Sequence, residues 1–188
     1  MGRKSSVEED QLIGQLSCVF REVGYEGATL TMLSEATGLK KASLYYRFPY
    51  GKEQMAREVL DQAWVWLEEH ILAPLGGAGT PSSRIDEMVR QLDKFYSGGK
   101  QACLLNMLSS SQIQEGPFTA LIQGAFEAWI AGLSTVVMDA GRDEKTARLR
   151  AERAIMMLQG SLVLSRGMRT TRPFKDFVRT VRSELLEK

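Results

Sequence analysis

Two short amphipathic segments flank Gly38, and their spacing is the strongest constraint that this sequence places on its fold. The first segment opens with Thr29, whose hydroxyl group suits a helix N-cap, and it closes with Gly38, which accepts the left-handed conformation of a helix end. The apolar positions recur at helical spacing and turn one side of both segments inward; they are Leu33, Ala36, Leu39, Leu44 and Phe48. The pattern predicts a helix-turn-helix.

The outward side of the second segment is polar and basic. The net charge of the whole chain is only +1, so affinity for nucleic acid must come from local clustering of lysine and arginine. We interpret this helix as one that enters the major groove, with Lys41 and Ser43 near base edges, Ala42 against a thymine methyl group and the other side chains on phosphates. The candidate DNA contacts are Thr29, Thr31, Lys40, Lys41, Ala42, Ser43, Tyr45, Tyr46, Arg47 and Lys52.

These residues resemble a known family. Gly24-Tyr-Glu-Gly-Ala-Thr29 precedes Gly38-Leu-Lys-Lys-Ala-Ser-Leu-Tyr-Tyr-Arg-Phe-Pro49, and Lys52-Glu53 follows. The combination is similar to the DNA-binding domain of the tetracycline-repressor (TetR) family of bacterial transcriptional regulators. The connection from Pro49 to Glu53 resembles the subgroup that includes regulators of multidrug-efflux genes. Three positions depart from the usual pattern: Lys40 replaces a capping residue, Arg47 a frequent histidine and Met32 a frequent polar residue.

The resemblance implies an all-helical protein of two parts. Residues 1–50 would form a three-helix DNA-binding domain, and residues 51–188 a helical domain for ligand binding and dimerisation. A homodimer formed through the last two helices would bind a palindromic operator on double-stranded DNA. A small hydrophobic or cationic inducer in the second domain would release the repressor.

The rest of the chain also shows helical rather than alternating periodicity, which predicts an all-α fold of about nine helices. Leu12, Leu16, Val19, Phe20 and Val23 form the buried stripe of the first helix, with Cys18 inside that region. Further helices are expected over 52–72, from a Ser83 cap to about Tyr96, near 103–112, over 118–137, from an Asp143 cap to Arg166, and from Pro173 onward. The clearest break is expected at 74–81, which contains Pro74 and Pro81.

Two features bear on assembly and on ligand binding. Gly160 and Gly167 in the last two helices permit close approach, either between subunits or within one chain. A cavity lined by aromatic and methionine side chains would accept bulky apolar or cationic molecules, although most such residues serve only as core. The candidate ligand contacts are Trp64, Tyr96, Asn106, Met107, Phe126, Trp129, Met156 and Gln159.

Other classes of function find little support. One histidine and two distant cysteines assemble no metal site, and we find no catalytic residues and no cofactor motif, so we expect no enzyme. The two cysteines, with no signal peptide and no apolar run near 18 residues, predict a cytoplasmic protein without a membrane span, and the resemblance implies that it is bacterial. Cys103 is either a reactive thiol or a small buried side chain.

Two alternatives stay open beside the ligand-responsive repressor. One is a DNA-binding regulator without a small-molecule ligand, controlled by a partner protein or by the Cys103 thiol. The other is a small-molecule binding protein whose first domain has lost its affinity for DNA.

Overall fold

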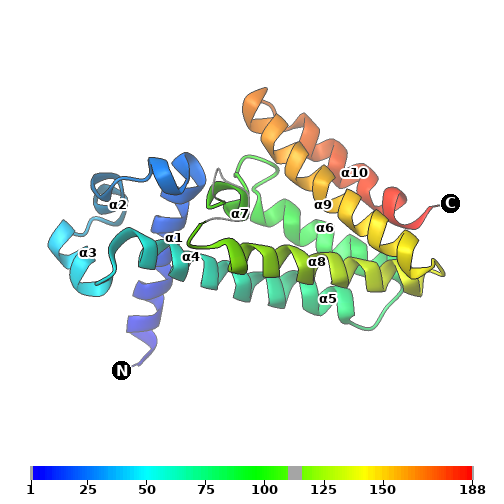
Figure 1. Cartoon of the computed structure of the whole chain (residues 1–188), viewed down its shortest axis with the longest axis horizontal. Coiled ribbons are helices and arrows are strands. Elements are labelled where there is room, and N and C mark those ends of the chain that lie inside the picture. Colours follow the sequence, from blue (N-terminus) through cyan, green and yellow to red (C-terminus); the bar gives the residue numbers. More distant parts are fainter. Residues whose placement is uncertain (1, 110–115, 188) are drawn as a thin grey trace. The chain divides into compact units, whose positions relative to one another are not determined.

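The computed structural model describes residues 2–109 and 116–187, with side chains from Glu9 onward, and the secondary structure in these ranges consists of helices joined by turns and short connections (Figure 1). The elements are α1 Gly2–Gly27, α2 Leu30–Thr37, α3 Lys41–Arg47, α4 Gly51–Leu67, a π-helical turn η1 Glu68–Leu72, α5 Ala73–Gly76, α6 Pro81–Phe95, α7 Leu104–Met107, α8 Thr119–Asp139, α9 Glu144–Gly167 and α10 Arg172–Leu186. Because α4, η1 and α5 follow one another without a break, the described ranges form nine continuous helices, as predicted.

The chain divides into two compact units. The first contains Met1–Trp64 and Leu104–Ile122, and the second contains Val65–Cys103 and Gln123–Lys188. The boundary between them falls within α4 and within α8, so each of these helices begins in the first unit and ends in the second. The domain boundary predicted after residue 50 follows the extent of the helix-turn-helix motif, whereas the two units are defined by compactness. The two divisions therefore describe different properties of the chain.

The first unit is built around α1, which bends at Gly24. This residue has φ 75° and ψ 179°, outside the helical region, and a side chain there would meet the Met107 carbonyl oxygen of α7 at 3.1 Å. Only glycine permits both the bend and the close approach. The stripe predicted for this helix is confirmed for Leu16, Val19 and Phe20.

In the second unit, α9 and α10 lie side by side in antiparallel orientation (Figure 1). The Asp143 side chain caps α9 by accepting the Thr146 N–H at 3.0 Å, as predicted. The interior of this unit is apolar and comes from α5, α6, α8, α9 and α10 and from η1; its members include Ile71, Leu75, Ile85, Met88, Leu92, Trp129, Leu133, Ala151, Ile155, Leu158, Phe174, Phe177 and Val181.

The helix expected to end at residue 72 continues through Pro74 to Gly76. Proline lacks an N–H and its ring would collide with the carbonyl group four residues earlier in an α-helix. The widened π turn Glu68–Leu72 comes directly before it, with the Ala73 N–H donating to the Glu68 carbonyl. This turn accommodates the proline without ending the helix.

Three further expectations need correction. The cap of α6 is Thr80, which accepts the Ser83 N–H at 3.2 Å, rather than Ser83. Cys18 is exposed, because it lies between the buried positions of α1 rather than among them. The short helix expected near 103–112 is present only as Leu104–Met107, and residues 110–112 lie outside the described ranges.

The expectation that the chain has no apolar run near 18 residues is corrected by α8. Among the described residues, one helix, Thr119–Asp139, is long and apolar enough to cross a membrane, with a mean hydropathy of 1.4 over 18 residues. Core helices pass the same test, and α8 has a buried side that includes Trp129, Leu133 and Val136. We therefore interpret its apolar character as that of a core helix.

A buried guanidinium group joins three helices of the second unit. Arg84 of α6 is 7% exposed, and it donates to the Leu75 carbonyl of α5 at 2.9 Å and to the Asp139 carboxylate of α8 at 2.6 Å. Removing the carboxylate would leave a buried charge with one partner fewer.

We predict that Asp139→Ala lowers the free energy of unfolding by about 1–3 kcal/mol, the cost of leaving a mostly buried charge short of a partner, reduced because Asp139 is half exposed. Asp86→Ala is the matched control, since it removes a carboxylate from an exposed ion pair with Arg182; it should cost less than about 1 kcal/mol. Urea unfolding of both variants measures the difference. Equal losses would contradict a special role for Arg84.

Candidate nucleic-acid interface

The turn between α2 and α3 is held by local hydrogen bonds. Thr29 caps α2 by accepting the Met32 N–H at 3.2 Å, and Gly38 takes the predicted left-handed conformation with φ 68°. The Ser34 hydroxyl donates to the Leu39 carbonyl at 2.6 Å. Lys40 occupies the N-cap position of α3 without a side-chain capping bond. The motif is therefore fixed largely within α2 and the turn that follows it.

Burial separates the two sides of the motif as the periodicity predicted for three of the five inward positions, whereas Ala36 is exposed and Leu39 is half-buried. Leu33, Leu44 and Phe48 have no exposed surface, which anchors α2 and α3 to the interior of the first unit. The predicted contacts that point outward and are exposed are Thr29, Thr31, Lys40, Lys41, Ala42, Ser43, Tyr45 and Tyr46. Tyr46 is 90% exposed and Tyr45 is 52% exposed. That these side chains contact DNA stays a prediction.

Tyr50 is a candidate that the sequence interpretation missed. Its ring is 85% exposed in the connection between α3 and α4, and its backbone N–H donates to the Gln54 side chain at 3.1 Å. A large exposed ring at a fixed position beside a recognition helix suits a phosphate or sugar contact. Its place directly after Pro49, outside the helical pattern, gave no periodic signal.

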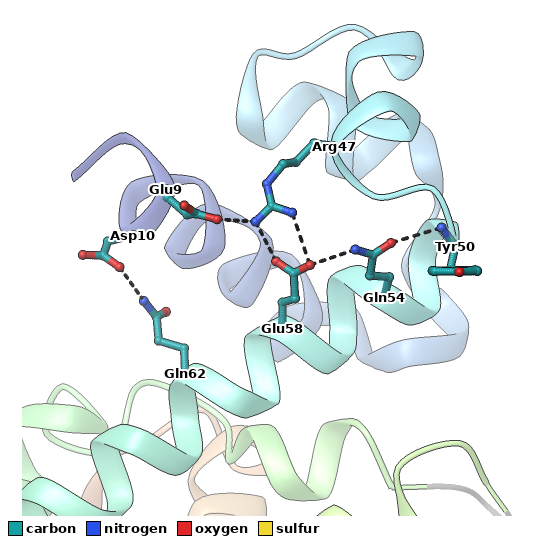
Figure 2. Close-up of polar contacts among 7 residues, drawn as sticks. All are labelled: Glu9, Asp10, Arg47, Tyr50, Gln54, Glu58 and Gln62. Carbon is teal, nitrogen blue, oxygen red and sulfur yellow. Dashed lines mark hydrogen bonds and ion pairs between the residues drawn. The ribbon is translucent and has the colours of Figure 1, made fainter. Parts of the chain in front are cut away.

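Arg47 is held within the first unit rather than pointing freely outward. It lies at the end of α3, and Figure 2 shows its guanidinium group between Glu9 of α1 and Glu58 of α4. One guanidinium nitrogen donates to Glu58 at 2.9 Å and also pairs with Glu9, and a second donates to Glu58 at 3.3 Å. The same arginine therefore ties the recognition helix to two neighbouring helices.

The cluster extends along α4 to the residues after the recognition helix. Gln54 donates to Glu58 at 2.9 Å and accepts the Tyr50 N–H, so α4 holds both the end of α3 and the following turn (Figure 2). Beside it, Gln62 of α4 donates to Asp10 of α1 at 3.4 Å. All of these residues belong to the first unit.

The electrostatic balance of the cluster favours a positioning role for Arg47. Partial burial lowers the pKa of Arg47, but hydrogen bonds and attraction from Glu9 and Glu58 outweigh it and raise the pKa overall. The guanidinium group stays charged, yet it faces two carboxylates and so adds no net positive charge at this place. A phosphate group would have to compete with both.

Lys52 is also engaged within the first unit. Its ammonium group donates to the Tyr25 carbonyl of α1 at 2.8 Å and lies 4.4 Å from the centre of the Tyr25 ring. The carbonyl belongs to the last turn of α1, where a cation is favourable. The pKa of Tyr25 is raised by burial and by the carboxylates of Glu53 and Glu26, so its phenol stays neutral.

The predicted ligand contacts are divided between the two units. Trp64, Asn106 and Met107 belong to the first, and Tyr96, Phe126, Trp129, Met156 and Gln159 to the second. Tyr96 and Trp129 are buried, at 2% exposure each. Met156 is 61% exposed and Asn106 is exposed, so neither lines an enclosed cavity in the single chain.

We predict that Glu58→Gln weakens DNA binding about 3- to 10-fold, equivalent to about 1 kcal/mol, because the recognition helix loses its charged tie to α4. If Arg47 instead bound phosphate, the same change would strengthen binding, since it frees the arginine and removes a negative charge. The dependence of affinity on salt should keep its slope, because no phosphate contact is lost.

Glu53→Gln is the matched control for this measurement. It removes the same charge from α4 but leaves Arg47 alone, because Glu53 pairs with Arg57 instead. Fluorescence anisotropy with labelled duplex DNA, repeated over a range of salt concentrations, should show unchanged or slightly tighter binding. Tighter binding by Glu58→Gln than by Glu53→Gln would overturn the positioning role.

Comparison with known proteins places this geometry in a family. Residues 81–180 match the family described as "Transcriptional regulator LmrA/YxaF-like, C-terminal domain". Residues 18–59 match "Bacterial regulatory proteins, tetR family". The second match includes α2 and α3 entirely, together with the start of α4.

Individual proteins agree with these matches. The chain is 22% identical over 167 residues to the HTH-type transcriptional regulator LmrA of Bacillus subtilis (strain 168), covering 87% of this chain and 89% of LmrA. It is 33% identical over 64 residues to IcaR of Staphylococcus epidermidis, described as a negative transcriptional regulator of the biofilm operon icaADBC, covering 34% of each chain.

Solved structures share the fold. A TetR transcriptional regulator from Legionella pneumophila superposes with a TM-score of 0.81 at 18% identity, covering 94% of this chain and 96% of that chain. A TetR-family regulator from Agrobacterium tumefaciens gives 0.81 at 16% identity, covering 96% and 98%. With both family matches and a helix-turn-helix of the expected geometry, this chain belongs to the TetR family of bacterial transcriptional regulators, with a C-terminal domain of the LmrA/YxaF-like type.

Proposed function

We propose that this protein is a homodimeric repressor that binds a palindromic operator and is released by a small hydrophobic or cationic molecule. The observation that supports operator binding is α3, whose side chains Lys41, Ala42, Ser43 and Tyr46 are exposed over a fully buried base of Leu33, Leu44 and Phe48. Such a repressor acts in the cytoplasm, where the chromosome is. Repression agrees with the negative regulator to which 34% of the chain is similar.

Dimerisation is supported by a second apolar side on α9. Its buried side includes Ala151, Ile155 and Leu158, but large apolar residues are also exposed on the opposite side: Leu149, Met156, Val163, Leu164 and Met168. From Met156 to Met168, together with Gly160 and Gly167, these recur every three or four residues, and Leu149 lies two turns earlier; this is the spacing of a helix–helix contact. Nothing lies within 4 Å of where a side chain would project from either glycine.

Two copies of this side would cover each other across a two-fold axis, since such an interface uses the same surface on both subunits. Two recognition helices would then read half-sites about 34–36 Å apart, one turn of the duplex. α10 would add mainly polar contacts at the edge, because its outward residues include Lys175, Arg179 and Arg182. Pairing through the last two helices thus depends mostly on α9.

Ligand binding is supported by buried polar atoms that lack partners. The indole nitrogen of Trp129 and the side-chain oxygen of Gln159 are buried and, among the described residues, form no hydrogen bond. An unpaired buried polar atom costs about 1–3 kcal/mol, so native structures usually satisfy it with water or a ligand. Both residues belong to the second unit, to α8 and α9.

Release would follow from a shift of population. α4 begins beside the recognition helix in sequence, is tied to it through Glu58, and continues into the second unit. A ligand that favours one orientation of α4 would select dimers whose recognition helices no longer match one turn of DNA. Coupling of this kind typically amounts to about 1–3 kcal/mol.

Control through a thiol has less support than control through a ligand. Cys103 is 3% exposed, and the Gln159 side-chain nitrogen donates to its sulfur at 3.3 Å. A cysteine in this setting behaves as a small buried side chain. A regulator controlled by a partner protein is the outcome to expect if no small molecule affects DNA binding.

We predict that Met156→Arg weakens the dimer at least 10-fold, because it places a charge at the centre of the α9 stripe. Val65→Arg is the matched control, since Val65 is also apolar and 49% exposed but lies on α4. Analytical ultracentrifugation of both variants over a range of concentrations measures the change. A dimer that resists Met156→Arg would place the interface elsewhere.

The function is tested by selecting operators from random duplex DNA with the purified protein and then adding a bulky apolar cation, tetraphenylphosphonium, or a bulky neutral dye, Nile red. We expect a dyad-symmetric operator, saturable binding of at least one probe, and operator affinity lowered about 5- to 150-fold by that probe. Trp129→Phe should weaken probe binding without changing the operator. Operator binding unaffected by either probe would favour the regulator without a small-molecule ligand.

A further inference from the structure

A basic pocket lies at the turn between α9 and α10, in the second unit. Its volume is about 310 Å³, at the lower end of the range for small-molecule sites, roughly 300–1,000 Å³. Cationic and hydroxyl side chains line it, from the ends of α9 and α10 and from the segment before α7: Lys100, Ser165, Arg166, Arg169, Thr170 and Thr171. No acidic residue is among its lining residues.

Two of the cations that line this pocket, Lys100 and Arg169, are not balanced by a carboxylate among the described residues. In the part of the chain that the structure describes, neither Lys100 nor Arg169 has a carboxylate within ion-pair distance. A neighbouring pocket shares Thr170 and Thr171 but contains two acidic residues, one of which pairs with Arg179. The anion-attracting region is therefore the first pocket.

A buried hydroxyl group adds a polar donor to the cations. Ser165 is 4% exposed, and its oxygen accepts the Phe174 N–H at 3.3 Å. We find no acceptor for its own hydrogen among the described residues, and the side chain lines the pocket. Hydroxyl donors beside arginine and lysine are the groups that bind phosphate oxygens in proteins.

Arg169 occupies a backbone conformation that a different residue would adopt more easily. It has φ 53° and closes α9, with the Thr170 N–H donating to the Ser165 carbonyl at 3.0 Å and its own N–H to the Arg166 carbonyl at 3.3 Å. Glycine is the usual residue at this position of such a helix end. Non-glycine residues in this conformation cost stability and cluster at binding sites, which agrees with a role of Arg169 in binding.

We propose that this pocket binds a small molecule through its phosphoryl group, with Lys100, Arg166 and Arg169 as the charged contacts. The pocket is separate from the site proposed above for a hydrophobic or cationic ligand, because neither Trp129 nor Gln159 lines the pocket. It is also separate from the proposed dimer contact. At about 100° per residue, Leu162 and Arg166 lie on a different side of α9 from Met156, Gly160 and Val163.

The test is Arg169→Gly in the full-length protein. The change removes one charged contact and installs the residue that the left-handed conformation prefers, so binding and stability should move in opposite directions. With wild-type protein, calorimetry at constant ionic strength should show saturable binding of inorganic phosphate and tighter binding of ribose 5-phosphate, but no binding of ribose. Arg169→Gly should lose at least 10-fold in affinity for both anions, while its thermal midpoint in chloride is unchanged or higher.

Lys145→Gln is the control for general charge. Lys145 is exposed in the first turn of α9, roughly 36 Å along the helix from Arg169, and its removal should leave anion binding unchanged. Phosphate stabilises many proteins by exclusion from their surface, and that effect would raise the thermal midpoint of all three proteins equally. The proposal would be overturned if phosphate raised the thermal midpoints of wild type, Arg169→Gly and Lys145→Gln equally. It would also be overturned if Arg169→Gly left the affinity for the anions unchanged.

Discussion

The tie between Arg47 and Glu58 determines how this protein can present its recognition helix. α3 has only seven residues, too few for a stable helix without tertiary support. Its buried side chains, Leu44 and the adjoining Phe48, fix which side faces inward. A guanidinium group held by carboxylates on α1 and α4 fixes the far end of α3 as well. In the proposed repressor, DNA recognition would therefore depend on charges that are paired within the protein.

The two sides of α9 place different demands on one helix. The inner side packs in the interior of the second unit, and the outer side carries exposed apolar residues that a single chain leaves uncovered. A helix that is apolar on both sides is suited to lie between its own domain and a second protein surface. The basic pocket at its C-terminal end lies away from that outer side, so the anion and the second subunit would not compete.

The sequence predicted the helix-turn-helix well because its determinants are local. The Thr29 cap, the left-handed Gly38 and the inward Leu33, Leu44 and Phe48 follow from chemistry within a few residues. Prediction from the sequence was less complete where the usual structural preference of a residue competes with its surroundings. Pro74 usually ends a helix, but the preceding π turn removes the clash. Arg47 fits a phosphate contact by residue type, yet its partners Glu9 and Glu58 lie 38 and 11 positions away, beyond the reach of spacing rules. The pocket around Arg169 also depends on segments that are distant in sequence.

The π turn at Glu68–Leu72 has a consequence for how the chain can vary in length. Such a turn holds one residue more than the α-helical path would need, and its neighbours on both sides keep regular helical geometry. Loss of one residue there would restore an ordinary turn and leave the sides presented by α4 and α5 in place, but it would also restore the clash of Pro74 unless that proline were replaced. Elsewhere in the continuous helix formed by α4, η1 and α5, the loss of one residue would rotate every later side chain by about 100°. The turn is thus where homologous chains that lack this proline can be one residue shorter without repacking either end.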